Sequence, residues 1–558
     1  MFSLSTIVRA AFLAAAAATA AQAAVDAPQS FYTVTAEIAL ARHQARAAAL
    51  QYAAAARQDP ALLPRAVEVA ADTLQPTIEL ALAQRWITAD PAALEAERAA
   101  ASAALSLHKI TIAAGHFRTL LTRSPLGLEA EFDSVERSLR EADNVYGARQ
   151  VADRLAGFFP SSPAARRLQG YTALRADDPA AAARSFREYL QAAATDAAAG
   201  AGDARRELVQ TARRARILAG DVEAPLAEAR AELEHADSPA GRLDYSLLLL
   251  SAKRDHQALD ELARLQSRPE AAPDALRLMG LIEFQSGDLD SAATRFAALL
   301  AGGHYADDAL YYLGSIAERH ADFERALTLY ARVQGGENGV AALLRAASIL
   351  RTHGEAASAE DLLNQLLQEE PQRAPAILAA RAQIDLLAGD AARAGAVLDA
   401  AVAEYPDSAD LAYAHASNLE ERGRVDAALR ELEALVRARP DDPAALNALG
   451  YTLADHSRRL TLARRLIDRA HAAAPKSAAI RDSVGWVLFR QGHAAEALPF
   501  LSEAYADEPG GDIGAHLGEV LWHLGKHAEA EHVWSEAGAL DSDSRLLKAT
   551  RQRLRSAQ

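Results

Sequence analysis

The chain has 558 residues, no cysteine and a formal net charge of −16 at pH 7. Without cysteine it can form no disulfide, no thiol nucleophile, no cysteine metal site and no lipoprotein anchor. The excess of acidic residues argues against nucleic acid or anionic lipid as the main partner. Half of the residues are apolar, which is enough to bury a long continuous core.

The first 23 residues have the three-part order of a secretory signal peptide. One positive charge, Arg9, precedes an apolar stretch at 10–21, and Ala21-Gln22-Ala23 forms a small-x-small cleavage site. The apolar stretch is too short for a comfortable membrane span. We therefore expect cleavage after Ala23 and export to the periplasm of a Gram-negative bacterium, with no transmembrane span left in the mature chain. The alternative interpretation is an alanine-rich amphipathic first helix.

The sequence of residues 24–194 indicates helical hairpins that match the repeat pattern only loosely. A residue on the first helix of each unit is followed twelve residues later by alanine on the second helix. A Gly/Ala loop at 195–203 then accounts for eight extra residues between two units. These pairs are Ala36 with Ala48, Ala101 with Ala113, Glu136 with Ala148 and Gly170 with Ala182, and a poor match falls near Val67.

Residues 204–543 form the main array, with a period of about 34 residues. A period of this length is typical of stacked helical hairpins, none of which can bury its apolar face alone. The small residue after the first apolar run of each unit is Ser246, Gly280, Gly314, Ala347, Ala382, Ala416, Gly450, Gly485 and Gly518. The alanine of the second helix is Ala258, Ala292, Ala326, Ala359, Ala394, Ala428, Ala463, Ala497 and Ala530.

Three further positions recur within the period. A large apolar residue lies four positions after the alanine in most units, which is one step along a helix face. Glycines such as Gly492 are expected to end first helices, and prolines such as Pro475 to end second helices. We infer that the two helices of a unit cross closely at the small residue, where only a short side chain lets the backbones approach.

This combination resembles the tetratricopeptide repeat (TPR) family. The clearest matches are the segments 449–475, 484–509 and 517–540. The resemblance implies an all-α, right-handed superhelix of about fifteen helical hairpins. The polar segment 544–558 is expected to form a C-terminal capping helix, which a terminal repeat needs for solubility.

No motif of an enzyme or a cofactor site was found. The chain lacks HExxH, GxSxG, the phosphate-binding GxxxxGK[ST] and the EF-hand loop. The best candidate metal ligands are His516, His523, His527 and His532, but scattered surface histidines are the alternative that we favour. We therefore expect a protein without enzymatic activity, metal or cofactor; a cryptic hydrolase is the rival hypothesis.

The remaining candidate site is a protein-binding surface on the first helices of the C-terminal units. In TPR superhelices these helices line the concave groove, and aromatic residues are favoured anchors of interfaces. The alternative is that the aromatic side chains pack between repeats. The familial clamp for a peptide carboxylate uses Lys, Arg and Asn, whereas this groove offers mostly acids. The candidate residues are Tyr413, Asn447, Tyr451, Asp482, Trp486, Phe489, Glu519 and Trp522.

A narrower resemblance joins both ends of the chain to exported proteobacterial TPR proteins. Segment 36–70 and the C-terminal repeats are similar to the group that includes the periplasmic adaptor of a carboxyl-terminal processing protease. The resemblance implies an adaptor or scaffold that couples a processing protease to cell-wall hydrolase clients. The alternative is a structural assembly factor for envelope polysaccharide secretion or outer-membrane machinery.

Overall fold

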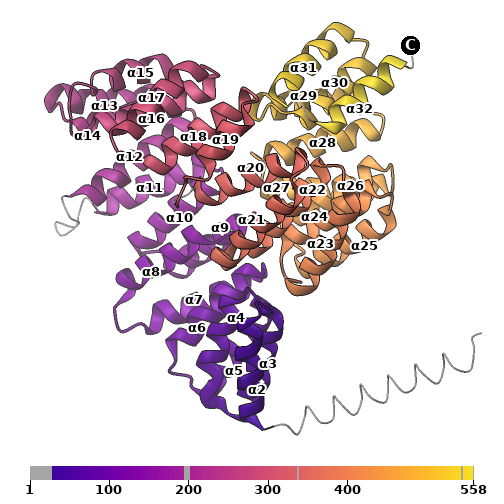
Figure 1. Ribbon diagram of the computed structural model, residues 1–558. Helices are drawn as coiled ribbons and strands as arrows, with labels where there is room; N and C mark the ends of the chain where they lie inside the picture. The colour runs from indigo at the N-terminus through magenta and orange to yellow at the C-terminus, as the bar shows by residue number, and fades with distance from the viewer. Residues whose placement is uncertain (1–27, 194–201, 336–337, 542–543, 557–558) are drawn as a thin grey trace, which may run out of the picture. The chain divides into compact units, whose positions relative to one another are not determined.

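The computed structural model describes residues 28–193, 202–335, 338–541 and 544–556. Within these ranges the regular secondary structure consists of 31 α-helices and two short 3₁₀ helices, with no strand (Figure 1). The prediction of an all-α fold is confirmed. The chain divides into two compact units, one of residues 1–125 with 403–407 and one of residues 126–402 with 408–558.

The first unit contains three helical hairpins. Each helix packs along the next, because short polar connections reverse the chain after every 10 to 14 residues of helix. A 3₁₀ helix at Pro60–Leu62 joins the first hairpin to the second. The helices are α2 (Gln29–Ala41), α3 (Ala45–Gln58), α4 (Leu63–Asp72), α5 (Pro76–Ala89), α6 (Leu94–Ser106) and α7 (Ile110–Arg123).

The second unit contains twelve hairpins and one final helix. The hairpins of its first half are α8 (Leu128–Glu141) with α9 (Val145–Phe158), α10 (Pro163–Arg175) with α11 (Pro179–Ala193), α12 (Asp203–Leu218) with α13 (Glu223–His235), α14 (Pro239–Ser251) with α15 (Asp255–Ala263), α16 (Ala272–Ser286) with α17 (Leu289–Ala301), and α18 (Ala306–Arg319) with α19 (Phe323–Tyr330).

The remaining hairpins of this unit lead to the C-terminus. They are α20 (Asn338–Thr352) with α21 (Ala356–Glu369), α22 (Ala374–Leu387) with α23 (Ala391–Glu404), α24 (Ala409–Glu421) with α25 (Val425–Ala438), α26 (Pro443–Asp455) with α27 (Leu460–Ala473), α28 (Ala478–Arg490) with α29 (Ala494–Asp507), and α30 (Gly511–His523) with α31 (His527–Leu540). A 3₁₀ helix at Pro371–Arg373 precedes α22, and α32 (Arg545–Ser556) follows the last hairpin. The described residues thus contain the fifteen hairpins that the period predicts.

The close crossing inside each hairpin occurs at the predicted small residue. A Cβ atom added at Gly450 would lie 2.6 Å from Cγ1 of Ile467, and one at Gly485 would lie 2.5 Å from Cγ of Leu501. Ile467 and Leu501 are the large apolar residues that the pattern places four positions after the alanine of the second helix. The spacing of the sequence therefore marks real side-chain contacts. In the C-terminal hairpins these contacts belong to one core cluster, because α26, α28 and α30 also pack on the second helix of the preceding hairpin.

The ends of the helices also follow the predicted signals. Helix α28 ends at Arg490, and Gly492 then takes a left-handed φ of 91° that glycine adopts without steric cost. Helix α27 ends at Ala473, two residues before Pro475, as expected for a residue that cannot continue a helix. Some units make the same left-handed turn without glycine, for example at Ala321 with a φ of 58°.

Two predicted segments fall outside the described residues. They are the signal peptide at 1–23 and most of the Gly/Ala loop at 195–203, of which Asp203 begins α12. Among the described residues, no helix has both the length and the hydropathy needed to cross a membrane.

Candidate protein-binding surface

The eight candidate residues lie on the first helices of four consecutive hairpins. Helix α24 carries Tyr413, α26 carries Asn447 and Tyr451, α28 carries Asp482, Trp486 and Phe489, and α30 carries Glu519 and Trp522. Because first helices stack on one another, with α26 against α28 and α28 against α30, residues 34 apart in sequence become neighbours. The structure therefore gathers most of these side chains into one connected group.

His516 on α30 lies at the centre of this group. Its Nδ1 is 2.8 Å from Oδ2 of Asp482, and its Nε2 is 3.3 Å from the hydroxyl of Tyr451. Its ring stacks on Trp486, with 4.0 Å between the ring centroids. Only 3% of His516 is exposed. The sequence indicates His516 only as a weak metal candidate and not in this role. The one signal is its position two residues before the small residue Gly518, on the side that faces the preceding hairpin.

The charge state of His516 results from two opposed effects. Burial lowers the pKa of the imidazole, but the charge and hydrogen bond of Asp482, together with the charges of Asp455 and Asp512, raise the pKa above its ordinary value. Burial also raises the pKa of the Tyr451 hydroxyl, and the nearby carboxylates of Asp455 and Asp482 raise it further. At neutral pH the Tyr451 hydroxyl is therefore protonated, and the carboxylate of Asp482 stabilises the imidazolium form of His516 relative to the neutral ring.

Trp486 is a packing residue in this structure. It is 4% exposed, and its indole nitrogen donates a hydrogen bond to Oδ1 of Asp455 at 3.1 Å. The guanidinium of Arg490 lies over its ring, 5.4 Å from the centroid, and is held by Asp455 and Ser457. Trp486 therefore joins α28 to the preceding hairpin, which is the alternative that the sequence left open for the aromatic residues.

Phe489 and Trp522 remain partly exposed. The Phe489 ring lies 5.1 Å from that of His523 and 5.4 Å from that of Trp486. Trp522 contacts Trp534 within its own hairpin, with 5.5 Å between the centroids. Both rings are therefore supported by neighbouring rings and partly accessible, as expected for an interface anchor.

The acidic candidates are already paired within the array. Asp482 binds His516, and Glu519 accepts a hydrogen bond from Arg553 of α32 at 2.6 Å. Both carboxylates are buried. In contrast, the Tyr413 hydroxyl and Oδ1 of Asn447 are buried and have no hydrogen-bond partner among the described residues. These two atoms come from the same position of adjacent first helices, three residues before the small residue.

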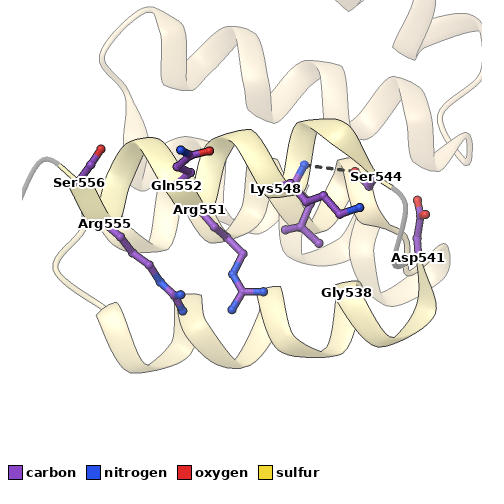
Figure 2. A pocket seen from close by; sticks show the side chains of 9 residues that line it. Gly538, Asp541, Ser544, Lys548, Arg551, Gln552, Arg555 and Ser556 are labelled. Carbon is purple, nitrogen blue, oxygen red and sulfur yellow. Dashed lines mark hydrogen bonds between the residues drawn. The ribbon is translucent and has the colours of Figure 1, made fainter. Parts of the chain in front are cut away.

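The C-terminal end of the array carries a basic groove. Its volume is about 710 Å³, and α31 and α32 line it together with the segment between them. Figure 2 shows Arg551 and Arg555 extending from α32 towards α31. Both guanidinium groups pair there with the carboxylate of Glu531, at 2.9 Å for Arg555 and 3.6 Å for Arg551. The exposed face of the last helix is therefore polar and positively charged.

The four histidines named as candidate metal ligands do not form one site. His516 is bound to Asp482, the His527 ring lies 4.3 Å from that of Trp522, and His532 pairs with Glu536 at 3.5 Å. Across the described ranges, no group of three or more His, Asp or Glu side chains is arranged to hold a metal ion.

Comparison with known proteins supports the repeat assignment. Residues 277–339 and 413–478 match the model of the family described as Tetratricopeptide repeat. A TPR repeat-containing protein of Pseudomonas aeruginosa, PA4667, is 33% identical over 190 residues, or 34% of this chain and 32% of that protein. A solved thermophilic TPR protein of Thermus thermophilus is 23% identical, with coverage of 30% of this chain and 91% of that one and a TM-score of 0.27.

A second kind of relative is an enzyme. The aspartyl/asparaginyl beta-hydroxylase of Mus musculus is 26% identical over 217 residues, which are 36% of this chain and 28% of that protein. The chain therefore spans about a third of the length of the curated relatives it matches. The chain is therefore an all-α protein of helical hairpins, in which residues 277–339 and 413–478 match the tetratricopeptide repeat.

Proposed function

We propose that this chain is a non-enzymatic scaffold that binds protein partners through the first helices of its C-terminal repeats. The match of residues 277–339 and 413–478 to tetratricopeptide repeats carries this proposal, because such repeats mediate protein–protein interaction. The partly exposed rings of Phe489 and Trp522 are the anchors that we assign to the docking surface. Trp486 and Asp482 support the surface from beneath, since both are buried.

The partner that suits this surface is a segment with apolar side chains and polar backbone groups. Phe489 and Trp522 offer apolar contact. The unpartnered Tyr413 hydroxyl and Asn447 Oδ1 offer a donor and an acceptor, which would become available if the surrounding side chains shift on binding. The acids contribute little direct charge to a partner, because Asp482 and Glu519 are buried and hydrogen-bonded to His516 and Arg553. Capture should therefore depend weakly on salt.

We propose further that the chain acts in the periplasm after cleavage behind Ala23, as an adaptor that couples a processing protease to cell-wall hydrolase clients. The composition of residues 1–23 and the resemblance to exported TPR proteins support this proposal. An adaptor without enzymatic activity would act by raising the effective concentration of two bound proteins. N-terminal sequencing that finds Met1 retained would rule out the export step.

The binding test compares three forms of the chain in a pull-down from periplasmic extract, followed by mass spectrometry. We expect the wild-type chain to retain a defined partner, and the double variant Phe489→Ala/Trp522→Ala to lose it. The matched control is Phe158→Ala, because Phe158 is an exposed aromatic residue on a second helix. Circular dichroism melting must show that the double variant is folded at the temperature of the assay.

The identity of the partner then separates the adaptor from its alternative. A processing protease or a cell-wall hydrolase supports the adaptor, whereas components of a secretion machinery support an assembly factor. Equal retention by the wild type and the double variant would remove Phe489 and Trp522 from the docking surface. Catalytic turnover by the purified chain would contradict the non-enzymatic assignment.

A further inference from the structure

The face of α32 that lines the basic groove is covered by a second helix in the hairpin before it. The residues one period of 34 before Lys548 and Gln552 are Gly514 and Gly518 of α30. A Cβ atom added at Gly514 would lie 2.5 Å from Cβ of Ala537 on α31, and one at Gly518 would also collide with a side chain of α31. The second helix α31 therefore packs on this face of α30. On α32 the same face lines the groove, and no second helix among the described residues covers it.

The side chains on this face of α32 are longer and more basic than those on α30. Arg551 and Arg555 stand where α30 has Leu517 and Leu521. A helix with an apolar face, packed against them, would bury both guanidinium groups without a partner, and burial of an unpaired charge is unfavourable. Gln552 in place of a glycine also prevents a close helix crossing. A helix that packs here must therefore carry negative side chains on the face that meets α32.

Positive charge is in excess in the groove. Helix α32 has five basic residues and no acidic one, although the whole chain has a net charge of −16. Arg551 and Arg555 share the single carboxylate of Glu531, which can balance only one of them. The Nε of Arg551 is buried and has no hydrogen-bond partner among the described residues. Lys548 also lines the groove, and the acidic lining residue, Asp541, lies at the end away from Arg555 (Figure 2).

Solubility alone does not explain this charge. A terminal helix that keeps the end of a repeat array in solution needs polar side chains, but it does not need charges of one sign. A groove with excess positive charge instead favours a partner with negative charge, because complementary charges steer association and fix the orientation of the complex.

We propose that the basic groove binds a helical segment of a partner protein that carries acidic side chains along one face. The segment takes the place that a second helix has in the other hairpins. Its carboxylates, one turn apart, pair with Arg551 and Arg555, which are also four residues apart on one helix face. Gly538 of α31 has no side chain and leaves room for the segment. The groove is formed by other helices than those of Phe489 and Trp522, and an adaptor that couples two proteins needs two docking surfaces.

The first experiment measures the binding of synthetic helical peptides to the full chain by fluorescence anisotropy. The acidic peptide has glutamate at every fourth position, and a scrambled peptide of the same composition has no acidic face. We expect the acidic peptide to bind, and Arg551→Glu/Arg555→Glu to weaken its binding by about tenfold or more, as the loss of a charged hydrogen bond does. The same variant should bind a peptide that has lysine in place of each glutamate.

A matched control has the same change of charge at another place. Arg465→Glu/Arg469→Glu alters two exposed arginines, also four residues apart, on the second helix α27. It should bind the acidic peptide as the wild type does. Binding by the wild type should fall as salt rises from low to physiological strength, because charges at the surface are screened.

A second variant fills the groove without a change of charge. A Cβ atom added at Gly538 would lie 3.7 Å from Leu547 and 3.9 Å from Arg551, which are ordinary contact distances, so Gly538→Leu should keep the fold. It should weaken the binding of the acidic peptide and leave the melting curve by circular dichroism unchanged. The variant Phe489→Ala/Trp522→Ala should bind the peptide normally, which separates this proposal from the docking surface proposed above.

Three results would overturn the proposal. The first is equal binding of the acidic and the scrambled peptide, which would indicate attraction by charge alone. The second is unchanged binding of the acidic peptide by both Arg551→Glu/Arg555→Glu and Gly538→Leu. The third is binding of phosphatidylglycerol vesicles, lost in Arg551→Glu/Arg555→Glu, without binding of the acidic peptide, which would assign the groove to a lipid surface.

Discussion

The helix crossing at Gly450 allows a quantitative test of the packing. Replacing glycine by alanine inside an exposed helix stabilises it by about 1 kcal/mol. At Gly450, however, the new methyl group would lie 2.6 Å from Cγ1 of Ile467 and 3.2 Å from the carbonyl oxygen of Ala463. The carbonyl cannot rotate away, so the two helices must separate, and overpacking of this kind costs about 1–3 kcal/mol. We therefore expect Gly450→Ala to be neutral or destabilising, and Gly450→Leu to be more destabilising still.

The matched control is Gly115→Ala in the interior of α7, where an added methyl group meets nothing within 4 Å. This substitution should raise the free energy of unfolding by about 1 kcal/mol, the full difference in helix propensity between alanine and glycine. Denaturant unfolding, with hydrogen exchange to locate the effect, compares the two variants. Exchange should rise only in α24–α29, because each hairpin contacts only the hairpins on either side of it. Equal stabilisation by both substitutions would refute the close crossing. Conversely, Ile467→Ala should cost less in the Gly450→Ala background than in the wild type, since it removes the atoms that collide.

Three further predictions concern other sites. Burial and the charge of Asp72 raise the pKa of Glu79 to about 8. The native chain therefore binds one more proton than the unfolded chain between about pH 4.3 and 8, and its free energy of unfolding falls as pH rises through this window. Urea unfolding should show that the stability of Glu79→Gln relative to the wild type increases across the same window. The raised pKa of His516 has the same sign. Its contribution is complete below about pH 6.5 and is lost as pH rises through the folded-state pKa, so a wild-type advantage over His516→Gln that grew with pH would contradict this sign. Finally, Ala321→Gly should raise the free energy of unfolding by about 1 kcal/mol, because Ala321 has a left-handed φ of 58°; an unchanged midpoint of thermal unfolding would show that the turn relaxes.

The hairpins could be predicted from the sequence because they depend on steric rules that act at fixed spacing. Gly170 and Phe186, for example, lie sixteen residues apart, and a Cβ atom at Gly170 would be 2.5 Å from the Phe186 ring. Only a small residue fits there, so a small residue in one helix indicates a contact with the large residue sixteen positions later in the next helix. The same logic ends α27 before Pro475 and α28 before Gly492.

The polar group around His516 could not be predicted, because it depends on which residues meet between hairpins. Asp482 and His516 are one repeat, or 34 residues, apart, but many other pairs of side chains share that spacing and do not meet. Whether Trp486 faces a partner or the preceding hairpin depends on the rotation of α28, which its aromatic character does not specify. Two features of the surroundings decide it: Asp455 accepts the indole hydrogen bond, and the His516 ring stacks on the indole.

The period of the sequence also determines where this array can bind a partner. A side chain on one first helix meets the residue about 34 positions later on the next, so charged positions pair along the array, as Arg351 does with Asp385 at 2.8 Å and Glu519 with Arg553 at 2.6 Å. Such pairs hold neighbouring hairpins in register and leave little free charge for a partner. A partner must then be recognised by residues whose side chains are not already fully paired with a residue of the neighbouring hairpin. Among the described residues these include the partly exposed rings of Phe489 and Trp522 and, in the other unit, the exposed apolar side chains of Phe31, Val34 and Ile38 on α2.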